Sequence, residues 1–245
     1  MSQKIALITG ANKGIGFETA KQLGKEGVTV IVGSRNKERG EKAVADLKAD
    51  GIDAEFLKLD VDNAADIQNA YDYISNKYGK LDILVNNAGI QIEQEGFGAN
   101  TTATTEEAIL TQTFATNFFN VVKLTNTLLP LIKKSDAGRI VNLSSILGSL
   151  TLHADPNSPI YASKLFSYNA SKTALNAYTV HLSAALADTN IKVNSGHPGW
   201  VKTDLGSDAA PMLVDEGAKT SVELALLGSD GPTGKFFHLG QELPW

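Results

Sequence analysis

Tyr168 and Lys172 are residues whose types and spacing could support proton transfer. They stand four residues apart in the stretch Tyr-Asn-Ala-Ser-Lys, and residues i and i+4 of a helix lie on one face. A lysine cation beside a phenol favours tyrosinate and lowers the pKa, which is ordinarily ~10. Such a phenol could donate and accept a proton near neutral pH. The alternative is an amphipathic helix whose Tyr and Lys face solvent, because such a helix would have the same residue pattern.

A glycine-rich turn near the N-terminus is a second candidate site. Thr9–Gly16 reads Thr-Gly-Ala-Asn-Lys-Gly-Ile-Gly between an apolar run and a helical pattern. Glycine lets the backbone approach a phosphate, and a helix N-terminus favours negative charge. The spacing differs from Gly-x-Gly-x-x-Gly, and no Gly-Lys-Ser/Thr of a P-loop follows. A βα turn without a ligand is the alternative.

Strand and helix patterns alternate along the chain and must position these residues. Strands are expected at 5–8, 29–32, 54–57, 83–85 and 139–143, from residue 192, and at 235–237. Helices are expected from about 15 to 23, in the charged stretch that ends at residue 50, and at 64–78, about 106–134, 168–186 and 217–227. Residues 91–105 are expected to form a surface loop. The alternation predicts one doubly wound Rossmann-type α/β domain over residues 1–245. Its parallel sheet would have about seven strands, with helices on both faces.

Unusual polar residues follow the expected strands. In a doubly wound sheet, ligands bind outside the carboxyl ends of the strands. The residues at those ends include the glycine turn, Arg35, Asp60, Asn87, Ser145 and residues 198–203. Each alone has a structural explanation, such as a cap or a solvated turn. Their common location favours a ligand site.

Composition excludes several classes of function. The net charge is −5 and no Lys/Arg run is present, which argues against a nucleic-acid partner. No apolar run has membrane-spanning length, and no signal-peptide layout begins the chain. The absence of cysteine removes disulfide and thiolate chemistry and fits a cytoplasmic location. The four histidines lack metal-ligand spacing, so no metal site is predicted.

The motifs, taken in order, strongly resemble the short-chain dehydrogenase/reductase family over essentially the whole chain. The matching features are Thr-Gly-x-x-x-Gly-x-Gly at Thr9–Gly16, Asn-Asn-Ala-Gly at Asn86–Gly89, a mid-helix Asn117, Ser145, and Tyr-x-x-x-Lys at Tyr168–Lys172. His197–Asp204 and the ending Leu243–Trp245 look most like the carbonyl-reductase-like branch. The joint pattern is specific, although its members singly are not.

The resemblance implies NADPH-dependent reduction of a ketone, aldehyde or quinone to an alcohol, with hydride from the cofactor. Tyr168 would donate the proton, and Ser145 would hydrogen-bond the substrate oxygen. Lys172 would bind the nicotinamide ribose and lower the Tyr168 pKa, and Asn117 would hold a relay water. Ser144 leaves an ambiguity of one residue. The implied NADP-binding residues are Gly10, Asn12, Lys13, Gly14, Ile15, Gly16, Arg35, Asp60, Val61, Asn87, Ala88, Gly89, Tyr168, Lys172, Pro198, Gly199, Val201 and Thr203. The expected substrate-binding residues are Ser145, Ile146, Leu147 and Trp200.

The end of the second expected strand favours NADPH over NADH. Ser34 stands where NAD-specific members of the family usually carry an acidic residue. Arg35 follows, and an arginine there accommodates a 2′-phosphate. Lys13 in the glycine turn would add a second cation. Solvated surface charge is the alternative for both cations.

Other functions would suit the same fold. One is a catalytically idle NADP-binding sensor or scaffold, since fold does not fix function. The complete set of Asn117, Ser145, Tyr168 and Lys172 disfavours it, because a binding module would not need them. An epimerase or dehydratase is a third possibility, which the carbonyl-reductase-like ending disfavours.

The stretch between Ser145 and Tyr168 is longer than is usual in the family, and the segment from about Leu150 to Phe166 lies within it. Pro156 and Pro159 disfavour a continuous helix there. The segment is expected to form a wall of the substrate pocket, because it joins Ser145 to Tyr168. It could also cover the surface through which subunits of the family commonly pair, which favours a monomer over a dimer or tetramer. Tyr161 lies within it but is followed four residues later by Leu165, not lysine.

Overall fold

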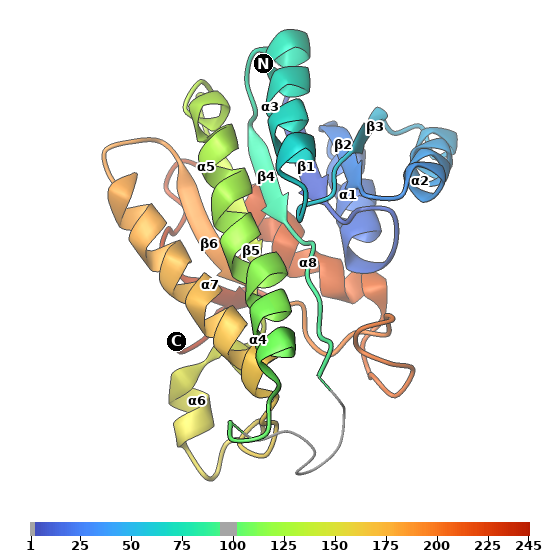
Figure 1. Ribbon diagram of the computed structural model, residues 1–245. Helices are drawn as coiled ribbons and strands as arrows, with labels where there is room; N and C mark the ends of the chain where they lie inside the picture. Colours follow the sequence, from blue (N-terminus) through green and yellow to red (C-terminus); the bar gives the residue numbers. More distant parts are fainter. Residues whose placement is uncertain (1–2, 94–101) are drawn as a thin grey trace.

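A mostly parallel sheet organises the computed structural model, which describes residues 3–93 and 102–245 (Figure 1). Eight strands of the described chain have the order β3-β2-β1-β4-β5-β6-β7-β8. They are β1 (Ile5–Thr9), β2 (Thr29–Ser34), β3 (Ala54–Lys58), β4 (Ile83–Asn86), β5 (Arg139–Leu143), β6 (Lys192–Gly196), β7 (Phe236–His238) and β8 (Gln241–Glu242). The first seven run parallel, and β8 pairs with β7 antiparallel. The predicted doubly wound fold is confirmed.

The eighth strand is an addition to the predicted sheet. It follows a two-residue turn in which Leu239 has φ 46° and Gly240 has φ 76°. Hairpin turns with two positive φ values match the twist of the flanking strands. Leucine rarely adopts such a conformation, so the Leu-Gly pair did not indicate a turn.

Helices cover both faces of the sheet, as Figure 1 shows. They are α1 (Gly14–Lys25), α2 (Lys37–Ala49), α3 (Ala64–Tyr78), α4 (Glu107–Phe114), α5 (Asn120–Ile132), α6 (Leu150–Ala154), α7 (Phe166–Ala185) and α8 (Val214–Ala225). A π-helical turn, Ala115–Phe119, joins α4 to α5, and Ile146–Gly148 forms a 3-10 turn. Residues 94–101 of the expected loop 91–105 lie outside the described residues. The short helix α6 begins the segment 150–166 and ends before Pro156 and Pro159, which were expected to disfavour a continuous helix.

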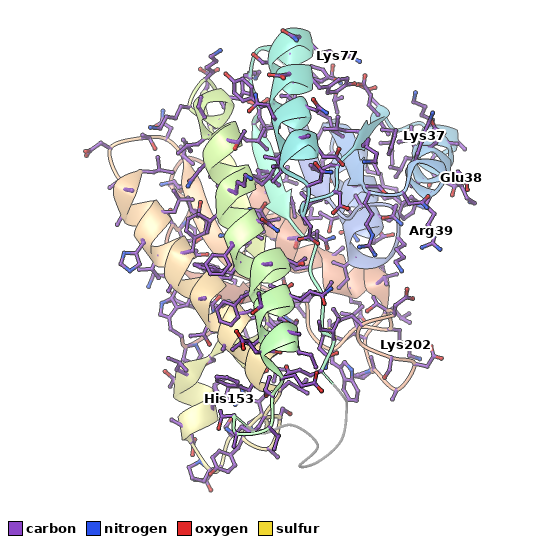
Figure 2. The ribbon with its side chains drawn as sticks, viewed as in Figure 1. Lys37, Glu38, Arg39, Lys77, His153 and Lys202 are labelled. Carbon is purple, nitrogen blue, oxygen red and sulfur yellow. The ribbon has the colours of Figure 1, made fainter. Side chains whose placement is uncertain are left out.

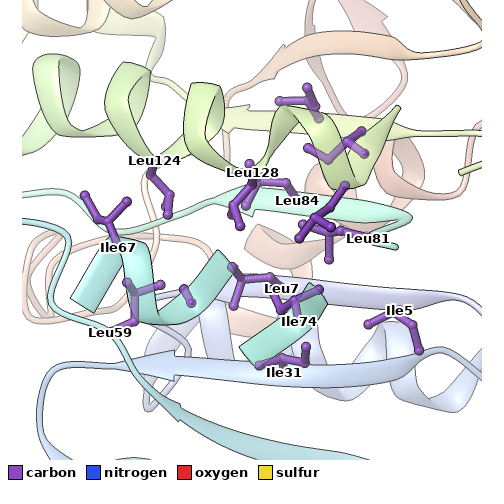
Figure 3. Close-up of a cluster of buried hydrophobic side chains, with 14 of the residues drawn as sticks. Ile5, Leu7, Ile31, Leu59, Ile67, Ile74, Leu81, Leu84, Leu124 and Leu128 are labelled. Atoms are coloured by element: carbon purple, nitrogen blue, oxygen red, sulfur yellow. The ribbon is translucent and has the colours of Figure 1, made fainter. Parts of the chain in front are cut away.

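Alternation along β1 builds two cores. Ile5 and Leu7 belong to the cluster under α3, α5 and α7, whereas Ala6 and Ile8 belong to the cluster under α1, α2 and α8. Figure 3 shows the first cluster, in which side chains of α3 and α5 meet those of the strands. Burial on both faces explains why the strands read as continuous apolar runs. The cores hold the strands so that their carboxyl ends meet at one edge.

Candidate active site

The glycine turn forms a tight cradle at the end of β1. Gly10 and Gly14 have φ values of 65° and 57°, which favour glycine. A Cβ on Gly16 would lie 2.5 Å from Asn87 Nδ2 and 2.8 Å from the Gly10 carbonyl oxygen. Helix α1 begins at Gly14, and no side-chain hydrogen bond caps its N-terminus. Its first N–H groups are therefore available to an anion such as a phosphate.

Asn87, which directly follows the neighbouring strand β4, stabilises this turn through hydrogen bonds. Its Nδ2 donates to the Thr9 carbonyl oxygen at 2.7 Å. Thr9 Oγ1 in turn accepts hydrogen bonds from the backbone N–H groups of Asn87 at 3.0 Å and Ala88 at 2.9 Å. The Asn-Asn-Ala-Gly motif thus fixes the glycine turn as well as lining the space beside it.

Most of the predicted cofactor residues surround one cleft of about 640 Å³. Those on its walls are Gly10, Asn12, Lys13, Gly14, Ile15, Gly16, Arg35, Asp60, Val61, Asn87, Ala88, Gly89, Tyr168, Lys172, Pro198 and Thr203. Gly199 and Val201 line a neighbouring cavity instead. Gly199 has φ 91°, and an added Cβ there would lie 2.1 Å from Met212 Sδ. The cleft therefore gathers sixteen of these residues from distant parts of the sequence.

Exposed basic side chains line the cleft. Arg35 and Arg39 are exposed and line it, as does Lys202. Figure 2 shows Arg39 on α2 and Lys202, after β6, along the same side of the molecule. Lys13, the expected second cation, forms an ion pair with Asp204 across the cleft mouth. Arg39 was not predicted as a cleft residue, although its position four residues after Arg35 could have indicated it.

Ser145 and Tyr168 approach each other where β5 and α7 meet. Both are 8% exposed, and the Ser145 hydroxyl lies close enough to the Tyr168 phenol to lower the pKa of that group. Ser145 Oγ also accepts a hydrogen bond from the Leu147 backbone N–H at 3.2 Å. Ser144 points elsewhere, since its Oγ donates to the Lys172 carbonyl oxygen at 3.5 Å. This geometry favours the second serine of the pair.

The expected lowering of the Tyr168 pKa is wrong for this structure. Burial raises the pKa of Tyr168 to about 12, and the nearby Ser145 hydroxyl offsets only part of that rise. The Lys172 ammonium lies 5.6 Å from the centroid of the Tyr168 ring and donates to the Leu143 carbonyl oxygen at 2.7 Å. Burial lowers the pKa of Lys172 to about 8. The helix spacing is as predicted, but desolvation is the largest cause of the pKa shift in both groups.

Burial of Lys172 predicts a pH-dependent effect on stability. The pKa falls from 10.5 to about 8 on folding, so between these pH values the unfolded chain binds more protons. Stability therefore rises with pH in this window, and the penalty for the buried charge is largest below pH 8. We expect Lys172→Met to raise the free energy of unfolding more at pH 7 than at pH 10, by on the order of 2 kcal/mol.

Urea unfolding of both proteins at the two pH values measures this difference. All other titrating groups are shared and cancel in the comparison. Equal effects of Lys172→Met at pH 7 and pH 10 would contradict the prediction.

Asn117 lies in the π-helical turn between α4 and α5. Its amide exchanges two hydrogen bonds with the Ile90 backbone, each 2.8 Å, and donates to Ser171 Oγ at 3.1 Å. Gly89 separates Asn117 from Lys172, because its added Cβ would lie 3.3 Å from Asn117 Oδ1 and 3.5 Å from Lys172 Nζ. Single π turns often occur at functional sites. The sequence predicted a continuous helix here and missed the turn.

A second cavity, of about 540 Å³, opens beside Tyr168. The predicted substrate residues Ser145, Ile146, Leu147 and Trp200 line it. Pro159, Ile160, Ser163 and Leu165 add a wall from the segment before α7. Both cavities share Ile15, Ser144, Tyr168, Pro198, Thr203 and Leu205. Tyr168 therefore stands at the junction of the two cavities.

The lining of this second cavity is uncharged. Its described walls contain no Lys, Arg, Asp or Glu. His197 lies on the wall, and burial, aided by neighbouring His238, lowers its pKa to about 3. The imidazole is therefore neutral at ordinary pH. The cavity suits an apolar, uncharged molecule with one polar group directed at Ser145 and Tyr168.

Comparison with known proteins decides the family. A family model described as short chain dehydrogenase matches residues 4–213. The chain belongs to this family. A Saponaria officinalis protein named short-chain dehydrogenase/reductase 1 is 33% identical, with 99% of this chain and 96% of the relative covered. A Mus musculus protein named carbonyl reductase (NADPH) 1 is also 33% identical, with 100% of this chain and 99% of the relative covered.

The resemblance extends to solved structures of the family. An NADPH-bound carbonyl reductase from chicken fatty liver superposes with a TM-score of 0.84 at 26% identity, covering both chains completely. The carbonyl-reductase-like resemblance of this short-chain dehydrogenase is thus confirmed. Within residues 3–93 and 102–245, no helix is long and apolar enough to cross a membrane. No group of three or more His, Cys, Asp or Glu side chains in these residues could hold a metal ion.

Proposed function

We propose that this short-chain dehydrogenase reduces a ketone, aldehyde or quinone to the alcohol with NADPH. The main support is the position of Tyr168 where the two cavities meet, with the Ser145 hydroxyl beside it on the wall of the second cavity. An idle sensor would not need a buried phenol, a serine and a lysine directed at this junction.

The first cavity fits a dinucleotide. Its glycine turn leaves no room for a Cβ at Gly16, and the N-terminus of α1 lacks a side-chain cap. The backbone N–H groups of this turn would hold the pyrophosphate. Asp60 and Val61 would line the adenine, while Asn87, Ala88 and Lys172 would line the ribose near Tyr168. Bound there, NADPH supplies the hydride to the carbonyl carbon.

Tyr168 would donate the proton to the carbonyl oxygen. With a pKa of about 12, the phenol remains protonated at ordinary pH and is available as an acid. Ser145 would hydrogen-bond the same oxygen and stabilise the negative charge that develops on it. Lys172, with its pKa near 8, is suited to return a proton toward Tyr168. Asn117 would hold the water that supplies it.

The cleft should select NADPH over NADH through Arg35 and Arg39. Both line the cleft where the ribose of the adenosine would lie, and an arginine accommodates a 2′-phosphate there. We expect the paired substitution Arg35→Ser with Arg39→Ser to lower the preference, measured as the ratio of kcat/KM values, by about 10–100-fold. A hydrogen bond to a charged group is worth roughly 1.5–3 kcal/mol, and 1.4 kcal/mol is a factor of ten.

Lys37→Ser provides the matched control. Lys37 also lies at the start of α2 (Figure 2) and pairs with Glu41 at 3.8 Å, outside the described cleft lining. Its loss removes one positive charge but should leave the preference unchanged. An unchanged preference in the double arginine variant, or an equal fall in Lys37→Ser, would refute specific phosphate recognition.

The second cavity would take an apolar, uncharged carbonyl compound. The residues that the structure describes on its walls include no Lys, Arg, Asp or Glu side chain to pair with a carboxylate or phosphate on the substrate. The decisive experiment is a panel of neutral and carboxylated ketones, aldehydes and quinones, assayed with NADPH and with NADH. Oxidation of NADPH by neutral members supports the proposal. A protein that binds NADPH but reduces no member would favour the sensor alternative.

The segment before α7 supports a monomeric state. Its helix α6 contacts the end of the chain, where the Thr151 backbone N–H donates to the Trp245 carbonyl oxygen at 2.9 Å. Trp245 in turn stacks on Phe236, with ring centroids 5.7 Å apart. We infer that this folded cover limits pairing of subunits, and sedimentation would report the mass. The cytoplasmic location stays a prediction.

A further inference from the structure

A buried carboxylate outside the predicted catalytic set contacts the backbone of Tyr168. Glu93, in the segment after β4, is only 4% exposed. One of its oxygens accepts a hydrogen bond from the Ser167 N–H at 3.0 Å, and the other accepts from the Tyr168 N–H at 2.9 Å. The same residue therefore occupies two donors of the first turn of α7.

These two donors have no local acceptor. Helix α7 begins at Phe166, and Leu165 at the capping position makes no side-chain hydrogen bond to the turn. The first N–H groups of a helix need partners from outside the helix, and Ser, Thr, Asp or Asn normally provides one. Leucine cannot. Glu93 supplies both bonds from a distant segment, and its negative charge also suits a helix N-terminus.

The surrounding bonds tie Glu93 to the rest of the candidate site. Ser171 Oγ donates to the Tyr168 carbonyl oxygen at 2.7 Å and accepts from the Asn117 amide at 3.1 Å. Asn117 holds the Ile90 backbone through two further bonds. The segment from Ile90 to Glu93 is thus fastened to both Asn117 and Tyr168. Side chains therefore hydrogen-bond to both the N–H and the carbonyl oxygen of Tyr168.

We propose that Glu93 is a positioning residue that sets the location of the Tyr168 hydroxyl by fixing the first turn of α7. The inference rests on the proposed function, in which Tyr168 donates the proton. Proton transfer requires close placement of the acid, and a displacement of 1 Å can lower a rate by ~100-fold. A carboxylate serving only as a helix cap would affect stability without a specific effect on turnover.

The test compares Glu93→Ala with Asn63→Ala. Asn63 caps α3 and likewise accepts two backbone hydrogen bonds, from Ala65 at 2.9 Å and Asp66 at 3.2 Å. Both variants should lose comparable stability in urea. At saturating NADPH, we expect kcat to fall about tenfold or more in Glu93→Ala, with the NADPH dissociation constant unchanged. Asn63→Ala should keep the wild-type kcat.

Glu93→Gln keeps one acceptor oxygen and covers the case in which Glu93→Ala does not fold. If Glu93→Ala folds, the kcat of Glu93→Gln should lie between the values of wild type and Glu93→Ala. If Glu93→Ala does not fold, the kcat of Glu93→Gln should lie below that of wild type. Wild-type kcat in either folded Glu93 variant overturns the proposal. So does an equal fall in kcat in Asn63→Ala.

A substrate-free readout separates this inference from the proposed function. The tyrosinate absorbance of Tyr168 is obtained by subtracting the absorbance of the matching Tyr168→Phe variant from the absorbance of each protein. In the folded Glu93 variants it should develop at lower pH than in wild type, closer to the ordinary value of ~10, because the phenol is less well enclosed. A wild type that reduces no carbonyl rejects the proposed function, and the titration then still reports on Glu93. An unchanged titration rejects the positioning role.

Discussion

Tyr168→Phe should nearly abolish carbonyl reduction while leaving NADPH binding intact. The substitution removes only the hydroxyl and keeps the ring that fills the junction of the two cavities. General acid catalysis typically contributes ~10²–10⁴-fold, so kcat should fall by about that factor. Stopped-flow or steady-state oxidation of NADPH measures turnover, and fluorescence titration measures the dissociation constant.

Tyr161→Phe is the matched control for this experiment. Tyr161 is 42% exposed, and its ring lies 4.4 Å from the Lys164 ammonium. Loss of its hydroxyl should leave kcat unchanged. If Tyr161→Phe loses activity while Tyr168→Phe keeps it, Tyr168 is not the proton donor. If Tyr168→Phe fails to bind NADPH, the phenol has a different role in the cleft.

Gly16→Ala should weaken NADPH binding by about 10–100-fold. The added methyl would lie 2.5 Å from Asn87 Nδ2, 2.8 Å from the Gly10 oxygen and 3.0 Å from Ala11 Cα. Two of these three neighbours are backbone atoms, so the turn itself must shift. Overpacking of this kind costs roughly 1–3 kcal/mol, and 1.4 kcal/mol corresponds to tenfold in affinity. The loss should be greatest in the dissociation constant of NADPH, measured by calorimetry.

Gly27→Ala separates local crowding from the general cost of replacing a glycine. Gly27 follows α1 at φ 78°, and an added Cβ there would have nothing within 4 Å. Left-handed backbone costs an alanine about 1–2 kcal/mol, so this variant should lose stability but keep its NADPH affinity. Equal affinities in the wild type and Gly16→Ala would show that the turn does not hold the cofactor.

The sequence by itself determined the fold and the order of the motifs. Burial on both faces makes each central strand a short apolar run, and such a run can be recognised from adjacent residues in the sequence. The glycine turn, the Asn-Asn-Ala-Gly stretch and the Tyr168–Lys172 pair were therefore visible as residue patterns. Their position at the carboxyl ends of strands followed from the alternation of strands and helices. Family membership followed from the joint occurrence of these motifs.

Only the tertiary structure decided how the side chains interact. The spacing of Tyr168 and Lys172 indicated attraction, but the depth at which α7 packs raises the pKa of the tyrosine. Lys13 pairs with Asp204, a residue 191 positions away. Glu93 caps a helix whose own capping position holds Leu165. Desolvation and long-range hydrogen bonds depend on residues brought together by folding, so spacing along the chain does not reveal them.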